Sequence, residues 1–286
     1  MSRLPCGIGL CFLGLITSWA PAAESAKITP DVVYGHKHGM ALTFDAYRPA
    51  EANGAGVLFM VSGGWYSVWK PAEESQPMFQ PLLDAGFTVF AVRHGSSPKF
   101  GISEAVEDVR LSVRYIRAHA ADFGIDPNRL GVFGMSAGGH LSLMLGTASD
   151  EGDANAKDPL QRVSDRVQAV VALVAPTDLR GIVWSAEGHS PQYEQFPALD
   201  ISVEEAAKVS PLLHVSSDDP PTLLLVGRKD ELVPIKHSQD IDAAFKEKNV
   251  TSELVIYDDS SHGFTPADAK LAFAAMVDWF KKHLVK

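Results

Sequence analysis

The stretch Leu130-Gly131-Val132-Phe133-Gly134-Met135-Ser136-Ala137-Gly138-Gly139-His140 reads as an apolar strand that runs straight into a helix through a single serine. Glycine stands two residues before and two residues after Ser136, where a sharp strand-to-helix turn leaves no room for side chains. Such a turn strains the Ser136 backbone and lifts its hydroxyl clear of the sheet. It also puts the N–H of Ala137 at the first turn of a helix, where an unpaired donor can face a developing negative charge. The spacing predicts a nucleophile elbow.

Apolar strand patterns and helical patterns alternate on both sides of this elbow. Strands are expected at residues 56–61, 87–92, 130–135, 167–174, 222–226 and 254–257, after a hairpin of strands at 32–34 and 42–47 with its turn at 35–39. Besides the elbow helix, helices are expected at residues 74–85, 102–123, 237–249 and 267–284. This order predicts an α/β protein with a mostly parallel central sheet of about eight strands and helices on both faces. Residues 175–220 show little periodicity and are expected to form a short lid or insertion.

The N-terminal segment differs in composition from the rest of the 286-residue chain. Residues 1–22 contain Arg3, an apolar run at 8–16 and the small residues Ala20-Pro21-Ala22, which is typical of a secretory signal peptide. The apolar run is too short to span a bilayer. We therefore expect a secreted or periplasmic protein with no membrane span in the mature chain and a single catalytic domain over 23–286.

Cysteine content and charge argue against several classes of function. Both cysteines, Cys6 and Cys11, lie in the expected signal, so the mature chain would hold neither a disulfide nor a cysteine-ligated metal. His36 and His38 stand two residues apart in the expected hairpin turn. No carboxylate or third histidine lies near them in sequence, so an exposed polar turn is favoured over a metal site. The formal net charge of −10 argues against nucleic acid and anionic lipid as partners.

A serine hydroxyl is a weak nucleophile, so Ser136 needs a base within hydrogen-bond reach and an acid that orients the base. Open parallel sheets collect such groups beyond the carboxyl ends of their strands. Asp230 follows the expected strand at 222–226, and His262 follows the last strand. Serine, aspartate and histidine then occur in the order expected for a fold with this elbow. Asp178, which follows the preceding expected strand, competes with Asp230 for the role of the acid.

Other histidines and aromatic residues allow more than one interpretation. His140 lies one helical turn beyond Ser136 on the expected buried face of its helix, which indicates a structural role. His94 lies where it could line a pocket, although it breaks the expected order of the triad. Aromatic residues in segments able to wall a pocket, or equally to pack in the core, are Trp65, Tyr66, Trp69, Phe100, Trp184, Tyr193 and Phe196. The candidates for substrate binding are Trp65, Tyr66, His94 and Trp184.

Three segments make the chain similar to a known superfamily: Asp126-Pro127-Asn128-Arg129, Ser136-Ala137-Gly138-Gly139-His140 and Ser261-His262-Gly263-Phe264. From about residue 31 to the C-terminus, the chain resembles α/β-hydrolases of the esterase/lipase kind, close to the hormone-sensitive-lipase-like and the acetylxylan- and feruloyl-esterase-like branches. Such families place His-Gly-Gly-Gly or His-Gly-Gly-x-Trp after the third strand. Here Val61-Ser62-Gly63-Gly64-Trp65 stands instead, so Val61 replaces the histidine that braces the loop. The resemblance implies an oxyanion hole formed by the amide of Ala137 with that of Gly63 or Gly64.

The residues and the resemblance together predict a secreted serine hydrolase that needs no metal or organic cofactor. It is expected to cleave carboxylic esters through an acyl-enzyme, with short acyl groups of the acetyl or feruloyl type on a carbohydrate or similar alcohol. A prolyl-oligopeptidase-like peptidase and an arylformamidase or other amidase are alternatives with the same triad. A triad-bearing binding protein without turnover is the alternative from another class, and an intact triad disfavours it.

Overall fold

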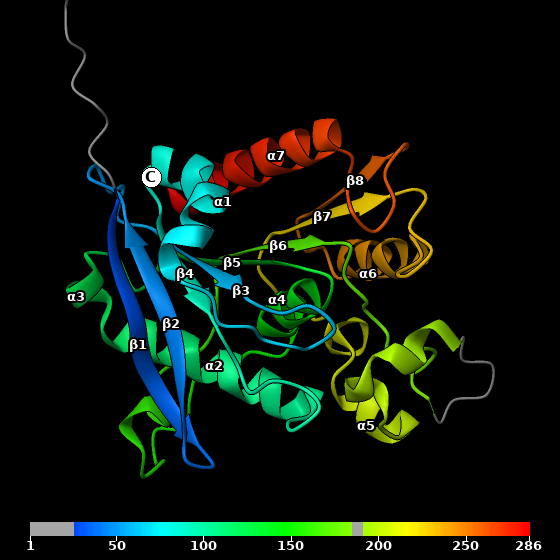
Figure 1. Cartoon of the computed structure of the whole chain (residues 1–286), viewed down its shortest axis with the longest axis horizontal. Helices are drawn as coiled ribbons and strands as arrows, with labels where there is room; N and C mark the ends of the chain where they lie inside the picture. Colours follow the sequence, from blue (N-terminus) through cyan, green and yellow to red (C-terminus); the bar gives the residue numbers. More distant parts are fainter. Residues whose placement is uncertain (1–25, 185–190) are drawn as a thin grey trace, which may run out of the picture.

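The computed structural model describes residues 26–184 and 191–286, which form one central sheet (Figure 1). Its strands are β1 (Lys27–Lys37), β2 (Met40–Arg48), β3 (Gly56–Met60), β4 (Thr88–Val92), β5 (Leu130–Met135), β6 (Ala169–Leu173), β7 (Thr222–Gly227) and β8 (Ser252–Tyr257). They lie side by side in the order β1-β2-β4-β3-β5-β6-β7-β8. The strands β1 and β2 form an antiparallel hairpin, and the strands from β3 to β8 run parallel. The predicted fold class is confirmed.

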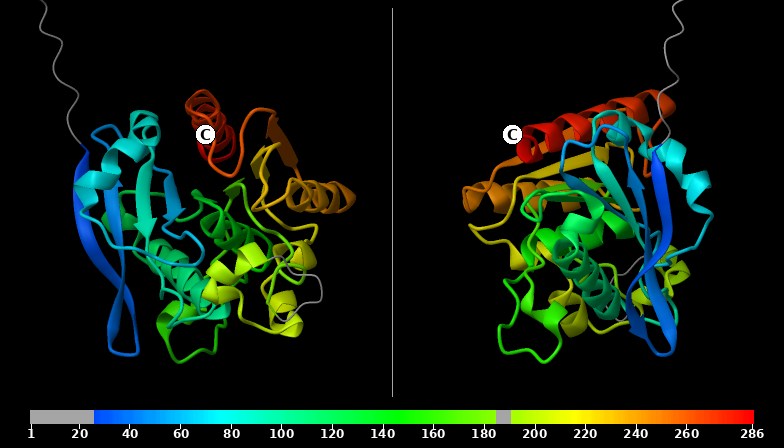
Figure 2. Two further views of the ribbon diagram at one scale, coloured as in Figure 1. Left: turned by 45° about the vertical axis from the view of Figure 1, so that its right-hand side comes forward. Right: turned by 90° about the vertical axis from the view of Figure 1, so that its left-hand side faces the viewer.

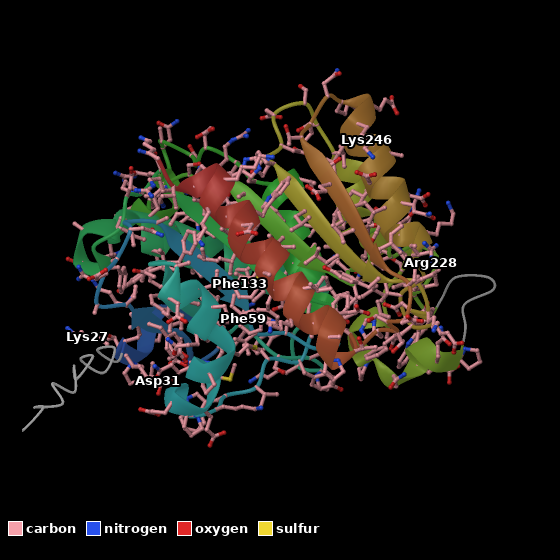
Figure 3. The ribbon with its side chains drawn as sticks, turned by 90° about the horizontal axis from the view of Figure 1, so that it is seen from above. Lys27, Asp31, Phe59, Phe133, Arg228 and Lys246 are labelled. Atoms are coloured by element: carbon pink, nitrogen blue, oxygen red, sulfur yellow. The ribbon has the colours of Figure 1, made fainter. Side chains whose placement is uncertain are left out.

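Helices cover both faces of the sheet (Figure 2). They are α1 (Ala72–Asp84), α2 (Ile102–Ala118), α3 (Ala120–Phe123), α4 (Ala137–Thr147), α5 (Val203–Lys208), α6 (Lys236–Glu247) and α7 (Pro266–Leu284). Figure 3 looks onto the face that α1 and α7 cover, where strand residues such as Val57 and Phe133 are buried. The helices α2, α4 and α6 cover the other face, against residues such as Leu58 and Val132. Successive strand residues point to opposite faces, which is why the central strands are apolar throughout.

The hairpin turn is shorter than predicted. β1 continues through Lys37 and β2 begins at Met40, so only His38 and Gly39 form the turn, with φ angles of 47° and 80°. Gly35 reads as a turn residue in the sequence, but it lies in β1 at a register irregularity. A Cβ at this position would come within 2.8 Å of a leucine side chain from α2, so the glycine serves close packing of the strand on the helix.

The helix predicted at 102–123 is two helices. α2 ends at Ala118, and after His119 the short helix α3 begins at Ala120. Gly124 ends α3 in the left-handed conformation, which glycine adopts without strain. Apart from this break and the longer β1, the ends of the predicted strands and helices agree with the observed ones to within two residues.

The segment predicted as a lid or insertion, residues 175–220, follows β6. In the part that the structure describes, it forms the 3-10 turns η2 (Pro191–Gln195), η3 (Pro197–Leu199) and η4 (Pro211–His214) around α5, at the lower right of Figure 1. Its buried Leu179, Ile182 and Leu199 join the core on the α4 face of the sheet. The predicted signal peptide lies outside the described residues and stays a prediction. Within the described ranges, no helix combines the length and the apolarity needed to cross a membrane.

Candidate active site

The elbow predicted at Ser136 joins β5 to α4. Ser136 has a positive φ (φ 56°, ψ −121°), which residues other than glycine rarely adopt. A Cβ at Gly134 would lie 2.3 Å from the carbonyl carbon of Gly138, and a Cβ at Gly138 would lie 2.6 Å from the carbonyl oxygen of Met60. Glycine is therefore required at both positions. The turn holds the Ser136 hydroxyl at the carboxyl end of a central strand.

The structure brings Ser136, His262 and Asp230 together. The Oγ atom of Ser136 lies 3.0 Å from Nε2 of His262, and Nδ1 of His262 lies 2.9 Å from Oδ2 of Asp230. Because a carboxylate only accepts, Nδ1 carries the imidazole proton and Nε2 accepts from the Ser136 hydroxyl. This geometry is the one that a serine nucleophile, a histidine base and an orienting acid require.

The carboxylate of Asp230 is fixed by its own loop. Its side chain is completely buried, and its Oδ1 accepts hydrogen bonds from the N–H groups of Leu232 (3.0 Å) and Val233 (2.8 Å). With Oδ2 on His262, both oxygens have partners, as a buried carboxylate requires. The His262 side chain is 24% exposed, so solvent and a substrate can reach the imidazole.

The loops that carry the acid and the base are bonded to each other. Arg228 and Lys229 each donate a backbone hydrogen bond of 2.9 Å, to the end of β8 and to the loop after it. Their side chains also pair with Asp258 and Asp259 at 2.5 Å and 2.9 Å, at the edge of the sheet where Figure 3 labels Arg228. The spacing between the acid and the base therefore rests on backbone bonds as well as on side chains.

Asp178, the competing candidate for the acid, has a different partner. Its carboxylate pairs with the guanidinium of Arg180 at 2.7 Å, and this hydrogen bond lowers the pKa of Asp178 although partial burial opposes it. Among the described residues, no bond joins Asp178 to His262. The geometry thus places Asp230, rather than Asp178, on the imidazole.

The loop after β3 forms a tight turn beside the nucleophile. Gly63 and Tyr66 exchange two backbone hydrogen bonds of 3.0 Å, and Gly64 and Trp65 between them have φ angles of 56° and 60°. The N–H of Gly63 is therefore used inside the turn, which is a correction to its expected role as an oxyanion donor. In the described part of the chain, the N–H groups of Gly64, Trp65 and Ala137 show no backbone acceptor. These amides are the candidates for the oxyanion hole, and Trp65 is the donor that the sequence did not indicate.

His94 braces this loop and is not among the residues that line the cavity described below, so its contact with substrate stays a prediction. Its Nδ1 lies 2.8 Å from the carbonyl oxygen of Gly95 and must donate, so its Nε2 accepts from the Ser62 hydroxyl at 2.9 Å. The N–H of His94 donates to Oγ of Ser67, whose hydroxyl donates to the carbonyl oxygen of Val61. Burial lowers the pKa of His94, which favours the neutral ring. The brace that a loop histidine would supply comes here from the end of β4.

A small apolar cavity lies beside Ser136. Its volume, counted as room for the centre of a water molecule, is about 20 Å³. The residues that line it are Gly64, Trp65, Ser136, Pro176, Ile182, Tyr193, Phe196, Leu199, Leu232 and Val233. The Phe196 ring packs against Gly64. A Cβ on that glycine would come within 2.6 Å of the ring. The insertion after β6 thus supplies much of the wall.

Of the residues expected to bind substrate, only Trp65 lines this cavity. Tyr66 is partly exposed, and the indole of Trp184 donates from Nε1 to the carbonyl oxygen of Tyr193 at 2.9 Å. Tyr193 and Phe196, two of the aromatic residues considered for a pocket wall, do line it. The aliphatic part of the lining has no sequence signal, because leucine, isoleucine and valine have the same pattern in any core.

Two family models match the chain. The BD-FAE model matches residues 44–245, which is well over half of the chain, and the dienelactone hydrolase family model matches residues 207–284. Among curated proteins, the chain is 26% identical over 239 residues to the probable carboxylic ester hydrolase LipM of Mycobacterium tuberculosis, and 27% identical over 233 residues to the esterase LipQ of the same organism. Each alignment covers 79% of this chain but only 53% and 55% of the two relatives. The chain thus spans about half the length of the curated relatives it matches.

Solved structures share the whole fold. A truncated form of a carbohydrate esterase from gut microbiota has a TM-score of 0.76 at 24% identity, and the match covers 92% of this chain and 98% of that one. The thermophilic esterase Est2 of Thermogutta terrifontis has a TM-score of 0.70 at 23% identity, with 91% and 93% covered. These likenesses show the α/β-hydrolase fold. Together with the family model that matches residues 44–245, they show that the chain belongs to the BD-FAE family of α/β-hydrolases.

Proposed function

We propose that this protein is a serine esterase that hydrolyses carboxylic esters through an acyl-enzyme. The observation that carries the proposal is the chain of hydrogen bonds from Ser136 through His262 to Asp230, at 3.0 Å and 2.9 Å. The Oγ atom of Ser136 attacks the ester carbonyl carbon while Nε2 of His262 takes the hydroxyl proton. Asp230 holds the imidazole in the required tautomer and stabilises its positive charge. The names of LipM and LipQ of M. tuberculosis, a probable carboxylic ester hydrolase and an esterase, support the same activity.

The rest of the cycle uses the same groups. The carbonyl oxygen becomes an oxyanion, which the amides of Ala137 and of Gly64 or Trp65 would stabilise. His262 gives its proton to the leaving alcohol, and the acyl group stays on Ser136. Water then loses a proton to His262 and attacks the acyl carbon. The bond from this carbon to Oγ of Ser136 breaks, His262 returns the proton to Oγ, and the acid is released.

The acyl group is proposed to be short, and acetyl is favoured over feruloyl. The cavity beside Ser136 leaves only about 20 Å³ in which the centre of a water molecule can move, so it fits a small apolar acyl group better than an aromatic one. The ring of Phe196, which lines this cavity and packs against Gly64, would limit the room for a longer or aromatic acyl chain. The alcohol would leave on the side of the partly exposed His262 imidazole, where a bulky alcohol such as a sugar has access to solvent.

Kinetics on matched esters and amides test the proposal. An alkoxide leaves the tetrahedral intermediate with modest proton transfer, whereas an amine must be protonated as it departs. We expect kcat/KM for p-nitrophenyl acetate to exceed that for p-nitroacetanilide by at least about a hundredfold. Ser136→Ala should abolish turnover while the melting temperature stays the same. Comparable efficiency on the anilide would favour the amidase or peptidase alternative, and a wild-type protein that neither turns over esters nor reacts with a fluorophosphonate would be a binding protein.

A further inference from the structure

Trp65 has a backbone conformation that a bulky residue does not adopt unaided. Its φ of 60° lies in the left-handed region, next to Gly64 at 56°. The two residues form the tip of the turn that Gly63 and Tyr66 close with backbone hydrogen bonds. Such strained residues persist only where the surrounding structure determines their conformation. The contacts of the Trp65 side chain therefore decide where the amides of the turn lie.

The indole of Trp65 is anchored on His140. It is buried, its Nε1 donates to Nδ1 of His140 at 3.3 Å, and the two rings meet edge to face with centroids 5.4 Å apart. His140 is completely buried in α4, one turn after the nucleophile, and its N–H donates to the carbonyl oxygen of Ser136 at 2.9 Å. The residue that holds the Trp65 indole thus belongs to α4, the helix that begins directly after Ser136.

The second ring nitrogen of His140 sets its tautomer. Nε2 lies 2.7 Å from the carbonyl oxygen of Val209, just after α5. A carbonyl oxygen only accepts, so Nε2 carries the proton and Nδ1 is left as the acceptor that the Trp65 indole needs. The direction of both hydrogen bonds is therefore fixed from Trp65 through His140 to Val209. His140 itself does not line the cavity beside Ser136.

We propose that His140 is a positioning residue that sets where the amides of Gly64 and Trp65 lie relative to Ser136, by holding the Trp65 indole. The inference rests on the esterase function proposed above, because the distance between this loop and Ser136 matters for catalysis only if Ser136 is the nucleophile. It gives His140 no contact with substrate and no proton transfer in the reaction.

A positioning role of His140 and a purely structural role in the core have different consequences. Oxyanion donors act on the tetrahedral intermediate and very little on the bound ester. A displaced loop should therefore lower kcat and leave KM nearly unchanged. It should also weaken a trifluoromethyl ketone, which binds as a tetrahedral adduct of Ser136 with a negatively charged oxygen. Loss of a packing residue would lower the melting temperature without this selectivity.

Two conservative variants separate the two nitrogens of His140. In His140→Asn, the side-chain oxygen takes the place of Nδ1 and can accept from the Trp65 indole, while the bond to Val209 is lost. In His140→Gln, the side-chain amide reaches the place of Nε2 and can donate to Val209, while the acceptor for the indole is lost. We expect His140→Gln to lower kcat on p-nitrophenyl acetate about 10- to 100-fold, with KM within about threefold of wild type. We expect His140→Asn to retain most of the activity.

Trp65→Phe supplies the matched control, because it removes the indole donor and keeps an aromatic ring. In the Trp65→Phe background, the difference between the Asn and Gln variants should disappear from kcat and from trifluoromethyl ketone inhibition. Melting temperatures establish that each variant is folded at the assay temperature. If His140→Asn does not fold, His140→Gln alone, compared with and without Trp65→Phe, gives the same coupling.

The proposal would be overturned if His140→Asn and His140→Gln lowered kcat equally. It would also be overturned if the difference in kcat between them persisted in the Trp65→Phe background. In either case His140 would be a core residue only. This outcome is distinct from failure of the esterase function itself. If Ser136→Ala retained activity, the nucleophile would be wrong. If Ser136→Ala were inactive while the His140 variants showed no coupling to Trp65, only the positioning role would fall.

Discussion

Ser136, Gly64 and Trp65 line one cavity, and all three have positive φ angles. A non-glycine residue in such a conformation costs of order 1–3 kcal/mol, which the surrounding structure must offset. At Ser136 the offset comes from the sheet and helix that the turn joins, and at Trp65 it comes from a buried indole with a hydrogen-bond partner. The reacting groups are therefore held by the backbone, so that little reorganisation is needed when the tetrahedral intermediate forms.

The assignment of the acid can be tested with two matched substitutions. We expect Asp230→Asn to lower kcat on p-nitrophenyl acetate by about three to four powers of ten, because an amide no longer holds the imidazole in the required tautomer. Asp178→Asn should change kcat by less than about tenfold, because its carboxylate pairs with Arg180 and not with His262. The opposite ranking would transfer the role of the acid to Asp178.

The sequence predicts which residues form the candidate site where chain order and strand ends determine their positions. Ser136, Asp230 and His262 each follow a strand of a parallel sheet, so the fold alone brings them near one another. The roles of Gly63 and His94 depend instead on a two-residue turn and on a bond between side chains 32 residues apart. Neither periodicity nor motif spacing contains that information.

At the scale of elements, the insertion after β6 is tied to the loop of the acid. The hydroxyl of Tyr193 donates to the carbonyl oxygen of Leu232 at 3.0 Å, and Leu232 in turn gives its N–H to the carboxylate of Asp230. The indole of Trp184 donates to the backbone of Tyr193. The wall of the cavity and the orientation of the acid therefore depend on the same few bonds.

Phe196 is the part of the insertion that should limit acyl length. We expect Phe196→Ala to raise the ratio of kcat/KM for p-nitrophenyl butyrate over p-nitrophenyl acetate by at least about tenfold, because each added methylene then gains apolar contact that the ring now excludes. Trp69→Ala is the matched control, since this exposed aromatic residue lies outside the cavity lining and should leave the ratio unchanged.

An unchanged ratio in Phe196→Ala would contradict the assignment of this cavity to the acyl group. A changed preference among acetate esters of different alcohols would instead assign the cavity to the leaving group.

The insertion shows where prediction from sequence ends. Its lack of periodicity marks it as irregular, but which of its side chains face Ser136 depends on how short 3-10 turns pack on the sheet.

At the scale of the whole molecule, buried histidines make the protein sensitive to acid. Burial lowers the pKa values of His94, His140 and His237 below their ordinary 6.5, in the case of His140 to about 4. In the unfolded chain, each imidazole takes up a proton as the pH falls through 6.5, whereas the folded protein resists this uptake. The unfolded state binds more protons in that window, so stability decreases as the pH falls from 6.5 towards 4.

A comparison of wild type with His140→Gln isolates one of these groups. Between pH 7 and pH 5, the free energy of unfolding of the wild type should fall by about 2 kcal/mol more than that of the variant. Urea denaturation at the two pH values measures this difference, and the other histidines cancel in the subtraction. Equal decreases would mean that His140 is protonated in the folded protein as readily as in the unfolded chain.

The edge strand β8 leads into the loop that holds His262, the proposed base. β8 has a neighbour on one side only, and most of its side chains are only partly buried, whereas the strand that leads into the elbow lies between two others. Opening at this edge of the sheet should therefore begin at β8, and its amide hydrogens should exchange with solvent before those of β5. Reversible fraying there would withdraw the imidazole from the nucleophile while most of the fold is intact. We therefore expect esterase activity to be lost on heating before the core of the sheet unfolds.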